Sequence, residues 1–230
     1  MNESQYIKDG ETLEILNENI KILQKEDGFK YGTDAVILSE FASVKPNERA
    51  LDLCTGTGII PLLLYIKSPR TNFFSIEIQE EIYDMAKRSL ALSGLTDKIN
   101  LMLGDLKDYK NHFLPQSFEV ITCNPPYMPE NTGKMCISET ERLSRHEILC
   151  NLEDVIKASG WLLKDGGRLY MVHRSDRLSD IITLMRKYKI EPKRIQFVHP
   201  YEEKEANLLL IEGQYGRKSG VKVLSPKIMR

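Results

Sequence analysis

A strand that runs directly into a glycine-containing turn and an apolar helix is the feature that most constrains this chain. Residues 49–53 have the apolar, β-prone pattern of a buried strand, and an apolar helix is predicted from about Gly58 to Ile66. Gly56 and Gly58, in the turn between them, let the backbone approach a ligand closely and leave helix N–H groups free to bind it. We therefore expect an α/β fold with a ligand site where this strand ends.

The side chain near the end of the same strand discriminates between cofactors. Asp52 would repel a pyrophosphate, whereas it would attract an ammonium or a sulfonium group. Gly58 is followed by Ile-Ile-Pro-Leu, which does not fit the G-x-G-x-x-G fingerprint of dinucleotide-binding folds. The turn therefore disfavours NAD and favours S-adenosylmethionine (SAM).

The next two predicted strands also end in acidic residues. The strand at 72–76 leads to Glu77, which could bind a ribose diol, and the strand at 100–103 leads to Asp105, which could accept a hydrogen bond from an adenine amino group. Any one of these acids alone could be an exposed loop residue. Because open α/β sheets bind ligands at the carboxyl ends of their strands, three acids at successive strand ends indicate one site.

A fourth predicted strand, at 118–121, leads to Asn124-Pro125-Pro126-Tyr127. The prolines remove two backbone N–H groups, so that the flanking carbonyl groups are left outside any strand ladder. The Asn124 amide oxygen and the Pro125 carbonyl can each accept one hydrogen of an NH₂ group, while the Tyr127 ring stacks on its plane. These residues predict a pocket for a planar amine; the alternative is an ordinary Asn-Pro turn.

The remaining segments frame this pattern. Alternating apolar runs at 12–16 and 19–24 predict a hairpin, and Thr33 is the expected N-cap of a following helix, with Asp34 in its first turn. Lys30 and Tyr31 could place a cation and a ring at the mouth of a pocket. The other expected elements are a long loop at 128–145, a helix that opens near Arg145 and His146, a helix end and turn at 161–167, a strand at 168–173 before Arg174, a helix at 179–188, an antiparallel pair at 193–199 and 206–213, and a possible edge strand at 221–224.

Composition limits the cellular compartment and the partners expected for this chain. No apolar run approaches the roughly 20 residues that span a bilayer, and the acidic N-terminus lacks a signal-peptide pattern. The four cysteines show no C-x-x-C pair and the four histidines no H-x-x-x-H pair, so we expect a cytoplasmic protein with reduced thiols and no structural metal. The formal charge is −1, but residues 167–230 carry 14 Lys and Arg against 7 Asp and Glu. This basic third could bind a phosphate backbone or could be a solvated surface.

The glycine turn, Glu77, Asp105 and Asn124–Tyr127 resemble the SAM-dependent methyltransferases that modify exocyclic amino groups. Further stretches resemble the tRNA(Val) adenine-N6 methyltransferase family, namely Lys30–Ala35, Leu51–Pro61, Arg145–Glu147 and Glu205–Asn207. The resemblance implies a Rossmann-like class I fold, whose seven-stranded sheet is mostly parallel with an antiparallel last strand, plus the N-terminal β-hairpin. Residues 1–48 would close over the cofactor and residues 49–230 would form the methyltransferase domain, in one compact unit, as a monomer or weak dimer.

The resemblance also assigns roles to residues. Catalysis would fall to Asn124, Pro125, Pro126 and Tyr127. SAM would be held by Thr33, Asp34, Asp52, Cys54, Gly56, Gly58, Glu77, Ile78, Asp105, Leu106 and Asn124. The substrate, an unpaired or flipped-out adenine of RNA, most simply of tRNA near the anticodon, would contact Lys30, Tyr31, Tyr127, Arg145, His146 and Arg174.

One residue departs from the family pattern. Cys54 stands where the first glycine of the turn is usual, and a positive φ there would cost about 1–2 kcal/mol. We expect weaker or slightly shifted SAM binding.

Three other functions fit parts of the pattern. The carboxamide of a glutamine, in a release factor or ribosomal protein, suits the same Asn-Pro-Pro-Tyr pocket, but those enzymes usually carry a helical domain before the SAM domain, and here about 48 residues precede the first strand of that domain. A small-molecule methyltransferase would not need this motif. A weakly catalytic protein that binds SAM and RNA is favoured by Cys54 and disfavoured by the intact Asn124–Tyr127.

Overall fold

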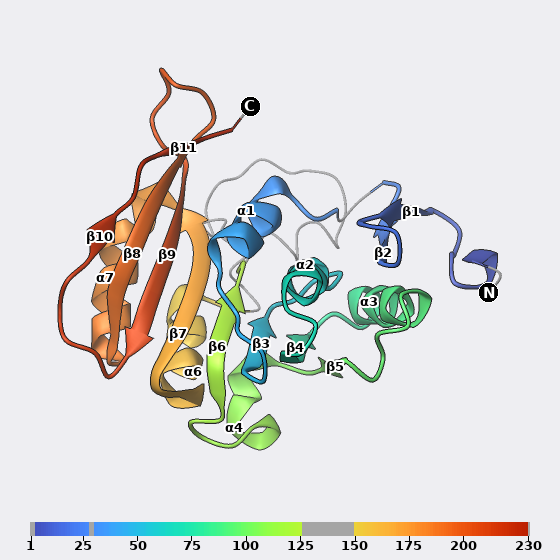
Figure 1. The fold of residues 1–230 in the computed structure, drawn as a ribbon, viewed down its shortest axis with the longest axis horizontal. Helices are drawn as coiled ribbons and strands as arrows, with labels where there is room; N and C mark the ends of the chain where they lie inside the picture. Colours follow the sequence, from blue (N-terminus) through green and yellow to red (C-terminus); the bar gives the residue numbers. More distant parts are fainter. Residues whose placement is uncertain (1–2, 28–29, 126–149, 230) are drawn as a thin grey trace.

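The computed structural model describes residues 3–27, 30–125 and 150–229 (Figure 1). The helices are α1 (Thr33–Phe41), α2 (Ile59–Lys67), α3 (Glu80–Leu92), α4 (Tyr109–His112), α6 (Leu152–Leu162) and α7 (Leu178–Lys187), with 3-10 helices η1 (Glu3–Gln5), η2 (Leu106–Asp108) and η3 (Ser175–Arg177). The strands are β1 (Glu11–Ile15), β2 (Lys21–Lys25), β3 (Arg49–Leu53), β4 (Asn72–Glu77), β5 (Ile99–Leu103), β6 (Phe118–Cys123), β7 (Leu163–Arg174), β8 (Ile190–His199), β9 (Leu208–Tyr215), β10 (Lys222–Val223) and β11 (Lys227–Ile228).

The main sheet has the strand order β10-β8-β9-β7-β6-β3-β4-β5, and β11 also pairs with β8. Strands β3 to β7 run parallel, whereas β9 is antiparallel to both β7 and β8. The seven long strands therefore confirm the expected sheet, and β10 confirms the expected edge strand. The two-residue β11 was not expected, because so short a segment carries no alternation pattern.

Between β3 and β6 the order in which successive strands are added to the sheet changes direction. From β3 the sheet continues to β4 and β5 on one side and to β6 and β7 on the other. In such sheets the carboxyl ends of the two strands at the reversal flank a crevice that binds ligands. Asp52 and Asn124 lie at the ends of these two strands.

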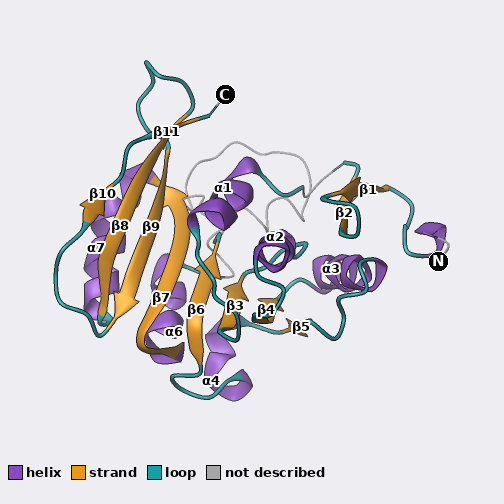
Figure 2. Ribbon diagram, in the orientation of Figure 1, coloured by secondary structure: helices purple, strands orange, loops and turns teal. Residues whose placement is uncertain are grey.

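Helices cover both faces of the sheet (Figure 2). Leu51 and Ile121 point to the face that packs against α6 and α7, whereas Ala50 and Val120 point to the face that packs against α1 and α2. This alternation follows from the two-residue side-chain period of a strand. Both faces are buried, which explains why the predicted strands read as continuous apolar runs.

Strands β1 and β2 form a separate antiparallel hairpin, which confirms the N-terminal prediction. Leu23 of the hairpin packs against Ile82 and Met85 of α3, and its backbone N–H donates to Ser89 Oγ at 2.9 Å. The hairpin is therefore anchored on α3, at the opposite end of the molecule from β8 (Figure 1).

Two local predictions are wrong. Thr33 is the first residue of α1, and the N-cap is Gly32, which has an extended backbone and no side-chain capping bond. The turn expected at 161–167 does not separate the helix from the strand, because α6 ends at Leu162 and β7 begins at Leu163. Leu163 pairs with Phe118, and the irregular register between Phe118 and Val120 accommodates the glycines that follow. None of the helices within the described ranges is long and apolar enough to cross a membrane.

Candidate cofactor and substrate site

The carboxyl ends of β3, β4, β5 and β6 bring four predicted site residues to one edge of the sheet. These are Asp52 on β3, Glu77 on β4, Asp105 after β5 and Asn124 after β6. Leu53 pairs in register with both Ile76 and Cys123, so these strand ends are level with one another. The arrangement confirms the expectation that the strand-end residues lie along one edge.

The glycine turn between β3 and α2 has the conformation that its glycines allow. Gly56 has a φ of 58° and Gly58 a φ of 83°, in the left-handed region that residues with a Cβ rarely adopt. Gly58 is the N-cap of α2, so the turn ends where free helix N–H groups begin. The hydroxyl of Thr57, within the turn, is buried and has no hydrogen-bond partner among the described residues. A buried orphan of this kind fits a site that a ligand completes.

Asp52 is held inside the sheet by two hydroxyl groups. Thr55 Oγ1 of the turn donates to Asp52 Oδ2 at 2.6 Å, and Thr122 Oγ1 of β6 donates to Asp52 Oδ1 at 2.6 Å. Burial raises the pKa of Asp52 to about 7, and the neighbouring Glu77 acts in the same direction, while the two hydroxyl donors oppose this rise. Sequence reasoning found Asp52 but missed both threonines. The signal for Thr122 was its position two residues before Asn124 in a strand that adjoins β3.

Glu77 fastens the turn to the next strand. Its Oε2 accepts from Gly56 N at 2.8 Å and its Oε1 accepts from Gln79 N at 2.9 Å. Burial raises the pKa of Glu77, although these backbone donors lower it. Each carboxylate oxygen has a second lone pair, so a ribose hydroxyl can still donate to this side chain.

The predicted adenine-binding residues lie after β4 and β5. Asp105 Oδ1 accepts from Lys107 N at 2.8 Å, which caps η2, and its carboxylate lies 3.5 Å from Lys107 Nζ. Leu106 is buried, whereas the Ile78 side chain is 36% exposed at the edge of the sheet. An exposed apolar side chain beside Glu77 can cover one face of an adenine ring.

Asn124 has a buried hydrogen-bond acceptor that a substrate could satisfy. Its Oδ1 is buried and forms no hydrogen bond with the described residues. Leaving such an acceptor unpaired costs about 1–3 kcal/mol, so the side chain is poised for a ligand that donates. Pro125 is buried beside it. Pro126, Tyr127, Arg145 and His146 lie outside the described residues.

Three thiols meet beneath the turn. Cys54 has a φ of 56°, which confirms the expected positive φ, and its side chain packs against the core cluster that contains Cys123 and Cys150. Hydrogen bonding to Cys123, followed by burial, raises the pKa of Cys54 well above its ordinary value. The described residues contain no group of three or more His, Cys, Asp or Glu side chains arranged to hold a metal ion.

The other predicted contacts lie in the hairpin-to-α1 segment and in α1 itself. Tyr31 donates its hydroxyl to Glu14 of the hairpin, and Lys30 beside it is exposed. Thr33 and Asp34 lie in the first turn of α1.

The two residues at the end of β7, His173 and Arg174, are engaged within the protein. Arg174 forms an ion pair with Asp176 at 2.9 Å. The preceding His173 is buried, and burial lowers its pKa to about 4, so its imidazole is neutral.

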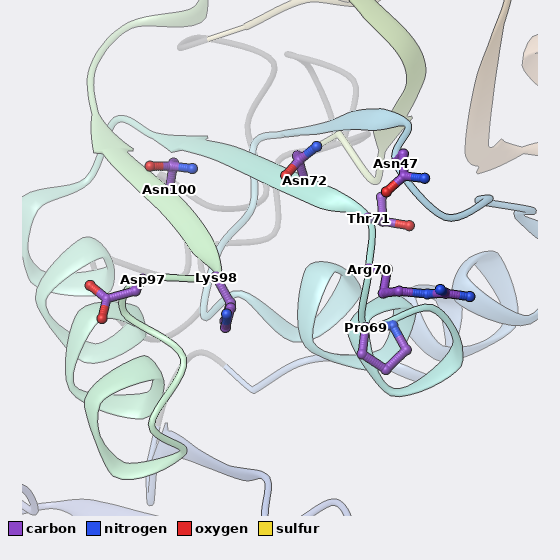
Figure 3. A pocket seen from close by; sticks show the side chains of 8 residues that line it. All are labelled: Asn47, Pro69, Arg70, Thr71, Asn72, Asp97, Lys98 and Asn100. Atoms are coloured by element: carbon purple, nitrogen blue, oxygen red, sulfur yellow. The ribbon is translucent and has the colours of Figure 1, made fainter.

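A separate hollow lies at the other edge of the sheet (Figure 3). Its walls come from the segment before β3 and from the amino ends of β4 and β5, and its lining residues are Asn47, Pro69, Arg70, Thr71, Asn72, Asp97, Lys98 and Asn100. Because Asp52, Glu77 and Asn124 lie at the carboxyl ends, this hollow is not part of the site that they form.

Comparisons with known proteins agree with this geometry. The family model for the methyltransferase small domain matches residues 26–189. A tRNA1(Val) (adenine(37)-N6)-methyltransferase from Bacteroides thetaiotaomicron is 32% identical over 72% of this chain and 68% of its own length. The enzyme of the same name from Porphyromonas gingivalis W83 is 32% identical over 80% of this chain and 73% of its own.

The solved structures agree on the fold. A crystal structure from Agrobacterium tumefaciens, described as a predicted O-methyltransferase, has a TM-score of 0.70 and 19% identity, and covers 85% of this chain and 87% of that one. The glycine turn, the Glu77 carboxylate and the buried Thr57 and Asn124 oxygens, which have no partner among the described residues, fit SAM and an amine acceptor. The chain therefore belongs to the methyltransferase small-domain family and is a SAM-dependent methyltransferase of the Rossmann-like class I fold.

Proposed function

We propose that this enzyme methylates the exocyclic N6 amino group of an adenine in tRNA, near the anticodon. The observation that carries the proposal is the Asn124 Oδ1 atom, which is buried at the end of β6 and has no partner among the residues that the structure describes. Relatives from two bacteria, at 32% identity, are named for N6 methylation of adenine 37 in tRNA1(Val).

The chain's own groups activate the amine. Asn124 Oδ1 and the Pro125 carbonyl accept the two amino hydrogens, which favours a pyramidal nitrogen and directs its lone pair out of the ring. SAM supplies an electrophilic methyl group on a sulfonium. The new N–C bond forms as the S–C bond breaks, and one amino proton then leaves to solvent. These hydrogen bonds strengthen in the transition state, so no dedicated base is required before transfer.

Different residues at the strand ends bind different parts of the cofactor. Glu77 holds the ribose diol, Asp105 the adenine amino group, and Ile78 and Leu106 the two faces of the ring. The negative charge of Asp52, together with the close backbone approach that Gly56 and Gly58 allow in the turn, suits the methionine end. Thr33 and Asp34, in the first turn of α1, close over the bound cofactor.

The RNA is held by adenine stacking and by phosphate contacts. A base in a duplex cannot reach Asn124, so the target is unpaired or flipped out and stacks on Tyr127, with Lys30, Tyr31, Arg145, His146 and Arg174 around it. Much of the basic C-terminal third is engaged elsewhere, because at least eight of its fourteen Lys and Arg, all in the described part of the chain, form ion pairs with acids. We infer salt-sensitive binding that uses few of these charges, by a monomer or weak dimer in the cytoplasm.

A labelling experiment tests the substrate. The purified protein is incubated with methyl-labelled SAM and either unmodified total RNA or a protein extract, and the labelled nucleosides or amino acids are identified. We expect N6-methyladenosine in tRNA. Label on glutamine would retain the fold and cofactor site but replace the substrate, and label in neither pool would contradict the proposal.

A further inference from the structure

A row of polar side chains crosses the sheet on the face that packs against α1 and α2. Ser75 of β4, Asp52 of β3, Thr122 of β6 and Tyr170 of β7 are paired in register, so their side chains point to the same face. Asp52 is central in this row. Its exposure is 2%, and those of Thr55 and Thr122 are 3% and 2%, so water does not compete for its oxygens.

The two donors to Asp52 come from the two halves of the site. Thr55 belongs to the cofactor turn, and Thr122 lies two residues before Asn124 on the strand that delivers the amine-binding groups. The Asp52 carboxyl therefore joins the segment that binds the methyl donor to the segment that binds the acceptor. Each bond is 2.6 Å long, as expected for a hydroxyl that donates to a charged oxygen.

We propose that Thr122 is a positioning residue for methyl transfer: through the Asp52 carboxyl it fixes the end of β6, and with it Asn124, relative to the cofactor turn. This inference rests on the proposed function for its catalytic consequence, but not for its effect on the cofactor turn. Thr122 itself touches neither reactant in this account.

The physical reason lies in what a buried carboxylate requires. A charged oxygen inside a protein is stabilised by the donors that it accepts from, and Asp52 has one hydroxyl donor on each oxygen. The neighbouring Glu77 carboxyl acts against these donors, because it disfavours the charged form of Asp52. Loss of the Thr122 hydroxyl would raise the pKa of Asp52 further. A protonated Asp52 carries no negative charge, so the hydroxyl bonds that join the turn to β6 through it would weaken.

Thr122→Val is the direct test, because valine keeps the shape of threonine and removes the hydroxyl. SAM affinity is measured against pH without RNA, and single-turnover methyl transfer is measured with tRNA. Ionised Asp52 favours the cationic cofactor, so affinity in the wild type should rise with pH. In Thr122→Val we expect the midpoint of this rise to move up by about one to two pH units, and transfer at pH 7 to fall about tenfold or more. Thr122→Ser, which keeps the donor, should restore both.

Thr71→Val is the matched control. Thr71 is 4% exposed and its hydroxyl donates to Lys45 O and to Ser68 Oγ at 2.8 Å each, at the opposite edge of the sheet. Its replacement should cost similar stability without moving the pH midpoint. If Thr122→Val does not fold, Thr55→Val removes the other donor and should shift the midpoint in the same direction.

An unchanged pH midpoint in Thr122→Val, or a serine variant that does not restore it, would overturn the inference even if the enzyme methylates adenine. Conversely, a shifted midpoint with no adenine methylation by the wild type would leave Thr122 as the link to the turn and would refute the proposed substrate alone.

Discussion

Cys54 adopts a left-handed backbone conformation, with a φ of 56°, at a position where a side chain is costly. For a residue with a Cβ this conformation costs about 1–2 kcal/mol. Packing of its side chain against the core cluster that contains Cys123 of β6 and Cys150, just before α6, offsets part of that cost. The backbone strain at Cys54 therefore destabilises the turn, whereas the contacts of its thiol stabilise it.

Two substitutions at Cys54 separate these effects. Cys54→Ala removes the thiol contacts and keeps the strain, whereas Cys54→Gly removes both. We expect the alanine variant to be less stable than the glycine variant by about 1 kcal/mol, the reverse of the usual order for these residues. Urea unfolding of the cofactor-free variants measures the difference. An alanine variant more stable than the glycine variant would show that the backbone at Cys54 is not strained.

At the scale of elements, a buried ion pair adds to the apolar packing that links the hairpin to α3. Arg88 Nη1 and Nη2 donate to the two carboxylate oxygens of Glu11 at 2.6 and 2.7 Å, and the Glu11 side chain is 2% exposed. Arg88→Ala would leave this carboxylate buried without its cation, at a cost of about 3 kcal/mol. Hydrogen exchange should then be faster throughout residues 11–25, while the main sheet keeps its protection.

Lys8→Ala supplies the comparison for the hairpin. The Lys8–Asp84 pair is 2.7 Å long, but its side chains are 63% and 41% exposed, so its loss should cost less than 1 kcal/mol, as is usual (about 0–1 kcal/mol) for surface pairs. Equal protection of residues 11–25 in the wild type and in Arg88→Ala would show that apolar packing on α3 suffices to dock the hairpin.

The sequence predicts an element correctly where a local residue pattern determines its ends. It fails where pairing with a distant strand determines them. The strand-end acids Asp52 and Glu77 were found because apolar runs end at them. The length of β7 was not, because Leu163 becomes a strand residue only through its pairing with Phe118. For the same reason the sequence could suggest Asp52 as a cofactor group but could not show Thr122 as its donor, since this contact joins residues 70 apart in the chain.

Across the whole molecule, two buried groups make stability depend on pH in opposite directions. The pKa of Asp52 is raised by burial from 3.8 to about 7, so its contribution is fully present below pH 4 and is lost as the pH rises through 7. The pKa of His173 is lowered by burial from 6.5 to about 4, so its contribution is lost as the pH falls from 6.5 to 4. Between pH 4 and 6.5 the two effects oppose each other.

Variants resolve the two contributions. Relative to Asp52→Asn, the free energy of unfolding of the cofactor-free wild type should fall by about 3 kcal/mol between pH 5 and pH 8. Relative to His173→Asn, it should rise between pH 4 and pH 6.5. Chemical denaturation at several pH values measures both differences. A wild type that parallels Asp52→Asn across this range would show that the Asp52 carboxyl is not buried as the structure has it.

The most direct test of the account is methyl transfer by Asn124→Ala, measured beside its affinity for SAM. The variant removes the Oδ1 atom, for which the described part of the chain offers no partner, and leaves the turn, Glu77 and Asp105 in place. We predict that transfer to tRNA adenine falls by about a hundredfold or more, as when one transition-state hydrogen bond is lost elsewhere, while SAM affinity changes by no more than about threefold. Near-wild-type transfer by Asn124→Ala would contradict the assignment of this site.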